Sequence, residues 1–146
     1  MPTVFDAAKY ILSKTGPMTT MKLHKFLYYA QGWSLVWEES PLFEDKIEAW
    51  VYGPVIPTLF AYHRGQYKVC AADFYSASCD VFSDEQKETM DLVIEGLKDT
   101  PAYLLIEKTH SEKPWINARK GLKGDERGHR EITHQAMSDY FATLLP

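Results

Sequence analysis

The feature that most constrains this fold is a continuous helical pattern over residues 20–37, whose apolar residues cover more than one face. Two stripes at helical spacing overlap within it, and together they are wider than the stripe of an ordinary amphipathic helix. The first stripe contains Leu23, Leu27, Ala30, Ser34 and Trp37, and the second contains Phe26, Ala30, Trp33 and Trp37. A helix this apolar must be covered on several sides, so the sequence predicts a central helix with the other elements packed around it.

Serine, threonine and proline residues mark where the other helices should begin. Ser83 with Gln86 has the spacing of a capping box, and Thr3 with Asp6 resembles one. Prolines and further threonines mark other boundaries as first helical residues or N-caps. Helices are therefore expected at about residues 4–14, 20–37, 58–64, 84–97, 102–109, 114–120 and 134–145. The segment 66–82 is expected to form an irregular connection or a small hairpin.

A short extended segment interrupts the helices. Residues 47–52 alternate apolar with less apolar side chains and are rich in β-branched and aromatic types, which favours a strand. Gly53 followed by Pro54 then makes a rigid corner, because glycine permits positive φ and proline fixes its own φ. The predicted fold class is mainly α: a single helical bundle of about six to seven helices with a short β element around residues 43–56, forming one domain over residues 1–146.

Composition and charge exclude several classes of protein. Hydrophobic residues make up 45% and charged residues 25% of the 146 residues, as in an ordinary globular domain and unlike a disordered chain. No apolar run approaches the ~18–20 residues that cross a bilayer, and residues 1–6 lack the basic and apolar stretches expected of a signal peptide. The net charge of -4 argues against a dedicated nucleic-acid binder but leaves room for a local basic patch. Cys70 and Cys79 do not have the spacing of zinc ligands, and we interpret them as reduced cytoplasmic thiols. A cytoplasmic protein without a membrane partner is therefore expected.

The motifs that would indicate an enzyme, a metal site or a cofactor are missing from the sequence. It contains no H-E-x-x-H, no C-x-x-C, no P-loop and no dinucleotide-binding glycine motif. His110 stands near Glu112 as a general base would, but no serine or cysteine nucleophile has a recognisable context, so a capping or turn role is preferred. We therefore predict no enzyme, no catalytic residue, no metal and no cofactor. A small hydrolase using His110 or His63 is the least favoured hypothesis.

Three blocks of sequence resemble a known family. They are Lys22 to Trp33 (KLHKFLYYAQGW), Pro41 to Pro57 (PLF, then IEAWVYGPVIP), and Thr109 to Arg119 (beginning THSEKPW), followed by Ile132, Tyr140 and Phe141. Together they resemble the SocA-like Panacea domain, which is also seen in phage-associated GepA-like proteins. The resemblance extends over essentially the whole chain, from Val4 to Leu145. Lys113 stands where family members often have glycine.

The resemblance implies a mainly helical antitoxin domain that neutralises a cognate toxin by direct protein contact. One relative instead delivers its toxin to the ClpXP protease, so a ClpXP-type protease is implied as a second partner of an adaptor. The alternative function is a nucleic-acid-binding regulator of its own promoter, without catalytic activity, although the net charge weighs against it. Residues 117–130 hold five basic and two acidic residues, a local charge of +3 that suits phosphate, an acidic partner or plain solvent.

Aromatic residues are concentrated between Phe26 and Tyr62, which hold ten of the chain's twenty. Such side chains dominate both protein cores and interface hot spots. Tyr28 and Tyr29 point about 100° apart on a helix, so at least one is expected at the rim of the core. The predicted partner-binding residues are Tyr28, Tyr29, Trp33 and Tyr52, ringed by His24 and Lys25 as an exposed basic edge. The alternative is that all four aromatic residues belong to the core.

The second and third blocks also predict a structural motif. The Gly-Pro corner is expected to pack Trp50 and Tyr52 into the core, with an aromatic edge presented to a partner as the less favoured alternative. The residues assigned to this structural motif are Trp50, Gly53, Pro54, His110, Pro114 and Trp115.

Overall fold

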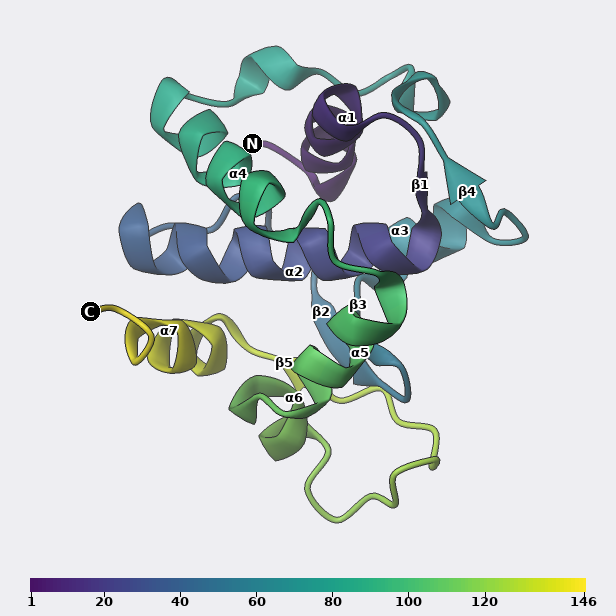
Figure 1. The fold of residues 1–146 in the computed structure, drawn as a ribbon, viewed down its shortest axis with the longest axis vertical. Helices are drawn as coiled ribbons and strands as arrows, with labels where there is room; N and C mark the ends of the chain where they lie inside the picture. Colours follow the sequence, from purple (N-terminus) through teal and green to yellow (C-terminus); the bar gives the residue numbers. More distant parts are fainter.

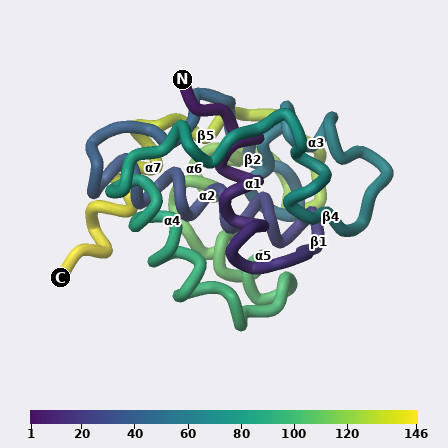
Figure 2. The backbone as a smooth tube through the Cα atoms, turned by 90° about the horizontal axis from the view of Figure 1, so that it is seen from above, coloured from purple at the N-terminus to yellow at the C-terminus, as the bar shows by residue number.

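The computed structural model describes residues 1–146 and places α2 (Thr20–Trp37) at the centre of the fold. α1 (Val4–Thr15) and α4 (Asp84–Leu97) lie above α2 in Figure 1, and α3 (Pro57–His63) lies behind its N-terminal end. α5 (Ala102–His110), α6 (Lys113–Ala118) and α7 (His134–Ala142) lie below it. The view turned by 90° also shows α2 between its neighbours (Figure 2). The prediction of a central, widely covered helix is confirmed.

The capping signals explain where the helices begin. The Thr3 backbone N–H donates to Asp6 Oδ2 at 2.8 Å, which closes a capping box on α1. Ser83 and Gln86 form the reciprocal pair at the start of α4, at 2.8 and 3.2 Å. Thr133 Oγ1 accepts the third N–H of α7 in the same way. All seven expected helices are present, with ends that differ by a few residues, and the mainly α fold class is confirmed.

The short β element is also confirmed. β2 (Ile47–Trp50) and β3 (Gly53–Val55) form an antiparallel hairpin in which Trp50 pairs with Gly53. β5 (Glu131–Ile132) pairs with the other edge of β2, so the strand order is β3-β2-β5. This third strand brings the chain after the 117–130 loop against the hairpin.

The segment between α3 and α4 is more ordered than the sequence indicated. β4 (Lys68–Val69) pairs with β1 (Met18–Thr19), and the 3-10 helices η1 (Ala71–Phe74) and η2 (Cys79–Val81) follow. The sequence indicated only an irregular connection or a small hairpin, because strands of two residues are too short to show an alternating pattern and the partner of β4 lies before α2.

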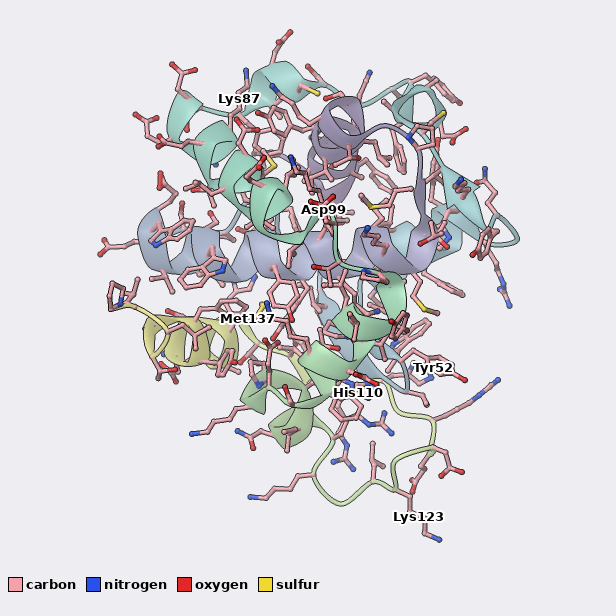
Figure 3. All side chains as sticks on the ribbon, viewed as in Figure 1. Tyr52, Lys87, Asp99, His110, Lys123 and Met137 are labelled. Atoms are coloured by element: carbon pink, nitrogen blue, oxygen red, sulfur yellow. The ribbon has the colours of Figure 1, made fainter.

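One hydrophobic cluster of 30 buried residues holds these elements together. It includes four residues of the apolar stripes of α2 and extends into α1, α4 and α7. Figure 3 shows Met137, one of its members, directly beneath α2. None of the helices combines the length and the apolar character that crossing a bilayer requires.

Candidate functional site

A pocket of about 600 Å³ opens beside the N-terminal half of α2. Its walls come from α2, the β2–β3 hairpin, α3 and the loop before β5. Three of the chain's five histidines line it, together with three cations and three aromatic residues, whereas no aspartate or glutamate does. These residues are His24, His63, His129, Lys25, Arg64, Arg127, Trp50, Tyr52 and Phe60. An acidic chain therefore has a basic pocket.

Two histidines meet in this pocket. His24 Nε2 lies 2.7 Å from His63 Nε2, and the backbone N–H of Ile56 donates to His24 Nδ1 at 3.1 Å. Because Nδ1 of His24 accepts, its proton lies on Nε2 and is donated to His63. The proton of His63 then lies on Nδ1, a buried atom without a hydrogen-bond partner. Burial lowers the pKa of both imidazoles, so the pair is neutral at pH 7.

Lys25 is a buried amine with one hydrogen bond. Its side chain is 1% exposed, and Nζ donates to the carbonyl oxygen of Pro54 at 3.2 Å. No carboxylate lies within salt-bridge distance of it. Burial lowers the pKa of Lys25 from 10.5 to about 7. An unpaired buried lysine is unfavourable for folding alone, which marks it as a candidate functional residue.

The hairpin and α6 are joined by the residues assigned to the structural motif. Trp50 Nε1 donates to Glu48 Oε1 at 2.9 Å, and its carbonyl accepts from Trp115 Nε1 at 2.7 Å. His110 stacks on Trp115 with ring centroids 4.0 Å apart, and Pro114 is buried in the first turn of α6. This cluster supports the wall of the pocket to which Trp50 belongs.

The Gly-Pro corner lies directly over Lys25. Gly53 has φ 116°, the positive value that the sequence anticipated, and Pro54 beside it is buried. The carbonyl of Pro54 is the acceptor for Lys25 Nζ, so this corner closes the inner end of the pocket.

The predicted exposed basic edge on α2 is wrong. His24 and Lys25 are both buried, because their side chains turn toward the hairpin and α3 and not toward solvent. Tyr28 and Tyr29 are buried as well, so the expectation that one of them lies at the rim is also wrong. The reason is α7, whose Phe141 ring lies 5.7 Å from the ring of Tyr28 and 5.9 Å from that of Tyr29.

Two of the predicted partner-binding residues do reach solvent. Trp33 is partly exposed and stacks on Trp37, with ring centroids 4.6 Å apart. Tyr52 is 61% exposed, so the expectation that the corner packs it into the core is wrong. It lies in the turn between β2 and β3, on the outer side of the hairpin (Figure 3), where neither strand covers it. Trp50 is half-buried against Phe60 and forms part of the pocket wall.

Glu112 is a buried carboxylate that the sequence did not single out as a site residue. The Tyr29 hydroxyl donates to it at 3.0 and 3.1 Å, and the Lys108 ammonium lies 4.7 Å from the centre of the Tyr29 ring. Burial raises the pKa of Glu112 to about 7, and the bond from Tyr29 opposes that rise. Glu112 is the N-cap of α6 but makes no cap bond with its side chain, which instead turns inward to Tyr29. A sequence pattern gives no sign of that orientation.

The basic segment 117–130 is organised by arginines that bond to the backbone. Arg119 is buried and donates to the carbonyl oxygens of Ala49 at 3.1 Å and Lys123 at 3.0 Å. Arg130 donates to the carbonyl of Lys120. Two of the five cations are therefore used to close the loop, and Arg127 faces the pocket.

The remaining pocket residues, Arg64 and His129 among them, were not predicted to act together with His24 and Lys25. They lie on four separate segments, so no fixed sequence spacing relates them. Only the folded chain brings them to one place.

Residues 23–116 match the protein family described as "Antitoxin SocA-like, Panacea domain". No curated protein and no solved structure matches the chain. The matched segment contains most of α2, the hairpin, α3, α4 and α5, and it ends inside α6.

Proposed function

This chain belongs to the family of SocA-like antitoxins with a Panacea domain, and we propose that it neutralises a cognate toxin by binding it directly. The observation that carries the proposal is the family match over residues 23–116. That segment includes most of the pocket lining and the hairpin turn, so most of the proposed binding surface lies within the matched part of the chain.

We place the first toxin contact at Tyr52. An exposed tyrosine is a good interface anchor, since it buries a large area and keeps a polar group for hydrogen bonding. Tyr52 stands at the rim of the basic pocket with Arg64 and Arg127, both of which are exposed. An aromatic anchor ringed by cations suits an acidic surface on the toxin.

Trp33, stacked on Trp37, is the second proposed contact. His24, Lys25, Tyr28 and Tyr29 take the supporting role of shaping α2 beneath these two contacts, because all four are buried.

Co-expression tests the proposal directly. A candidate toxin encoded beside this chain is expressed alone and together with it, and growth is scored. We expect the toxin to arrest growth alone and the pair to restore it, with a complex of the two recovered by size-exclusion chromatography. Arrest that persists despite abundant folded chain would contradict the antitoxin function itself.

Exposed tyrosines elsewhere in the chain offer matched controls for the contact. Tyr52→Ala should weaken toxin binding by about 1–2 kcal/mol, the usual scale for an anchor residue, with the thermal midpoint kept. Tyr67→Ala and Tyr75→Ala remove the same side chain from positions that are 79% and 82% exposed, and should change affinity little. Equal affinity for Tyr52→Ala and the controls would move the contact away from the hairpin while leaving the antitoxin function intact.

The alternative mechanism is delivery of the toxin to a protease, and the amount of toxin in the cell distinguishes it from blocking by direct binding. In cells with ClpXP, an adaptor lowers the amount of toxin, whereas a blocking antitoxin leaves that amount unchanged. We expect rescue to persist in cells that lack the protease. The proposal also places the chain in the cytoplasm, where the free thiols of Cys70 and Cys79 remain reduced.

A further inference from the structure

We propose that the pocket between α2, the β2–β3 hairpin and α3 binds a small phosphorylated aromatic ligand of the nucleoside monophosphate class. This activity goes beyond toxin binding and does not depend on it. The observations that carry it are buried hydrogen-bond donors without acceptors on residues that line the pocket, cations at its rim and an aromatic wall.

Size comes first. The pocket has a volume of about 600 Å³, within the range of roughly 300–1,000 Å³ that small-molecule sites occupy. Four separate segments converge on it, as is common where a concave site is built between elements. It is therefore large enough for a sugar phosphate and a base together.

Buried donors on two residues that line the pocket have no acceptor in the protein. Lys25 in its charged form has three N–H donors, of which one is used on the Pro54 carbonyl. The Nδ1–H of His63 is buried and has no partner. No carboxylate lines the pocket, so nothing there competes for these donors. A group that only accepts hydrogen bonds, such as a phosphate, fits this arrangement.

The rim carries the charge that a phosphate dianion requires. Arg64 and Arg127 approach from α3 and from the loop before β5, and both are exposed enough to reorient onto a ligand. One guanidinium group can donate two parallel hydrogen bonds to a phosphate, which orients the ligand as well as attracting it. His129, the third basic residue of the rim, lies with Nδ1 3.5 Å from Glu48 Oε1.

An aromatic wall stands beside these groups. Trp50 packs edge-to-face on Phe60, with ring centroids 5.0 Å apart, and its indole N–H is fixed by Glu48. Bases stack on such side chains irrespective of their sequence identity. A rigid tryptophan in the wall favours a phosphate that carries an aromatic ring over inorganic phosphate. An acidic side chain of a protein partner would offer one carboxylate and no ring, so it fits fewer of these features.

Calorimetry with defined probes tests the proposal. AMP, GMP, CMP and UMP are titrated into the full chain at pH 7, with adenosine and inorganic phosphate as the two halves of a ligand. We expect at least one nucleotide to bind about tenfold more tightly than either half. Lys25→Met should weaken that nucleotide by about tenfold and Arg127→Met by several-fold, because each removes a phosphate donor.

Matched variants separate the pocket from general charge effects. Lys22→Met changes a lysine on the same helix that lies outside this pocket, and Lys123→Met changes an exposed lysine on the same loop as Arg127. Both should bind the nucleotide as the unchanged chain does. Arg127 is exposed, so its variant keeps the fold even if Lys25→Met does not.

Two results would overturn the proposal. The first is that none of the four nucleotides binds more tightly than phosphate. The second is that Arg127→Met and Lys123→Met weaken nucleotide binding equally, which would show nonspecific attraction to the basic loop. If nucleotides fail to bind while Lys25→Met and Arg127→Met lose the toxin, the pocket is a protein-binding anchor.

Discussion

Gly53 leaves open the space that the end of the Lys25 side chain occupies. A Cβ atom built on Gly53 would lie 2.7 Å from Lys25 Cε and 2.8 Å from Thr109 Oγ1. The backbone at Gly53 also has φ 116°, which side-chain-bearing residues rarely adopt. The glycine of the hairpin thus permits both the turn of β2 into β3 and the burial of a lysine beneath it.

Gly53→Ala should therefore lower the free energy of unfolding for two reasons at once. Positive φ costs an alanine about 1–2 kcal/mol, and the contact with Lys25 and Thr109 adds about 1–3 kcal/mol of overpacking. Gly65→Ala is the control, because Gly65 has φ 89° but nothing within 4 Å of the added Cβ. Chemical denaturation should show the larger loss for Gly53→Ala. Equal losses would mean that Lys25 moves aside freely.

Lys25→Met should make the protein more stable at neutral pH. The unfolded lysine keeps its proton up to about pH 10.5, whereas folding lowers the pKa to about 7. Between these two pKa values the unfolded state binds more protons than the folded state. The free energy of unfolding therefore decreases as pH falls toward 7. Removing it should gain on the order of 1–4 kcal/mol at pH 6.5, as for other buried charges replaced by apolar groups.

The gain from Lys25→Met should shrink as pH rises from 7 to 10. His24 and His110 are the other titratable groups near Lys25, and burial lowers the pKa of both below 6.5, outside this window. Urea denaturation at pH 6.5, 8 and 9.5 measures the difference. A difference that does not change with pH would show that Lys25 is charged throughout.

Glu112→Gln should stabilise the protein at pH 8 and leave it unchanged near pH 4. Folding raises the pKa of Glu112 to about 7, so between its ordinary value and pH 7 the folded state binds more protons than the unfolded state. The contribution of Glu112 to the free energy of unfolding is therefore largest at low pH and is lost as pH rises to about 7. Glutamine keeps an acceptor for the Tyr29 hydroxyl and should gain about 1–3 kcal/mol at pH 8. Glu107→Gln, on the exposed side of α5, should change little at either pH.

Local signals made the helices predictable, because their physical cause lies within a few residues. The Thr3–Asp6 and Ser83–Gln86 bonds span three residues each, so the sequence contains the whole interaction. The positive φ of Gly53 is a local property too, because glycine permits positive φ in the turn before Pro54.

The site was not predictable in the same way, because its partners are far apart in sequence. His24 meets His63 across 39 residues, and Lys25 meets Pro54 across 29. The sequence KLHK looks like a solvated edge, and only the hairpin and α3 folding over it make it buried. Tyr28 and Tyr29 were misplaced for the same reason, because α7 covers both from the far end of the chain.

The contact between α2 and α7 depends on another glycine. A Cβ on Gly32 would overlap the ring of Phe141, so the ring occupies the place of a side chain. Gly32→Ala should destabilise the fold by about 1–3 kcal/mol, because the rigid ring must move. Gly96→Ala, on the exposed side of α4 with nothing within 4 Å, should instead stabilise by about 0.5–1 kcal/mol.

A second substitution checks the cause of the Gly32→Ala effect. Combined with Phe141→Leu, Gly32→Ala should lose less than it does alone, as expected for residues in direct contact. Strictly additive losses would show that Gly32 acts through some other neighbour.

Tyr28 and Tyr29 are neighbours with opposite hydrogen-bonding states. The buried hydroxyl of Tyr28 has no partner, whereas that of Tyr29 donates to Glu112. An unsatisfied buried polar group costs about 1–3 kcal/mol. Tyr28→Phe removes that group and keeps the ring against Phe141, so it should raise the free energy of unfolding by about 1 kcal/mol.

Tyr29→Phe should have the opposite effect, a loss of about 1–3 kcal/mol, because it takes a donor from a buried carboxylate. The same atom is deleted in both variants, so differences in volume and in the unfolded chain nearly cancel. Thermal and urea unfolding of the two proteins side by side measure the difference. If Tyr28→Phe loses as much as Tyr29→Phe, then the Tyr28 hydroxyl makes a hydrogen bond in solution, for which a buried water is the available partner.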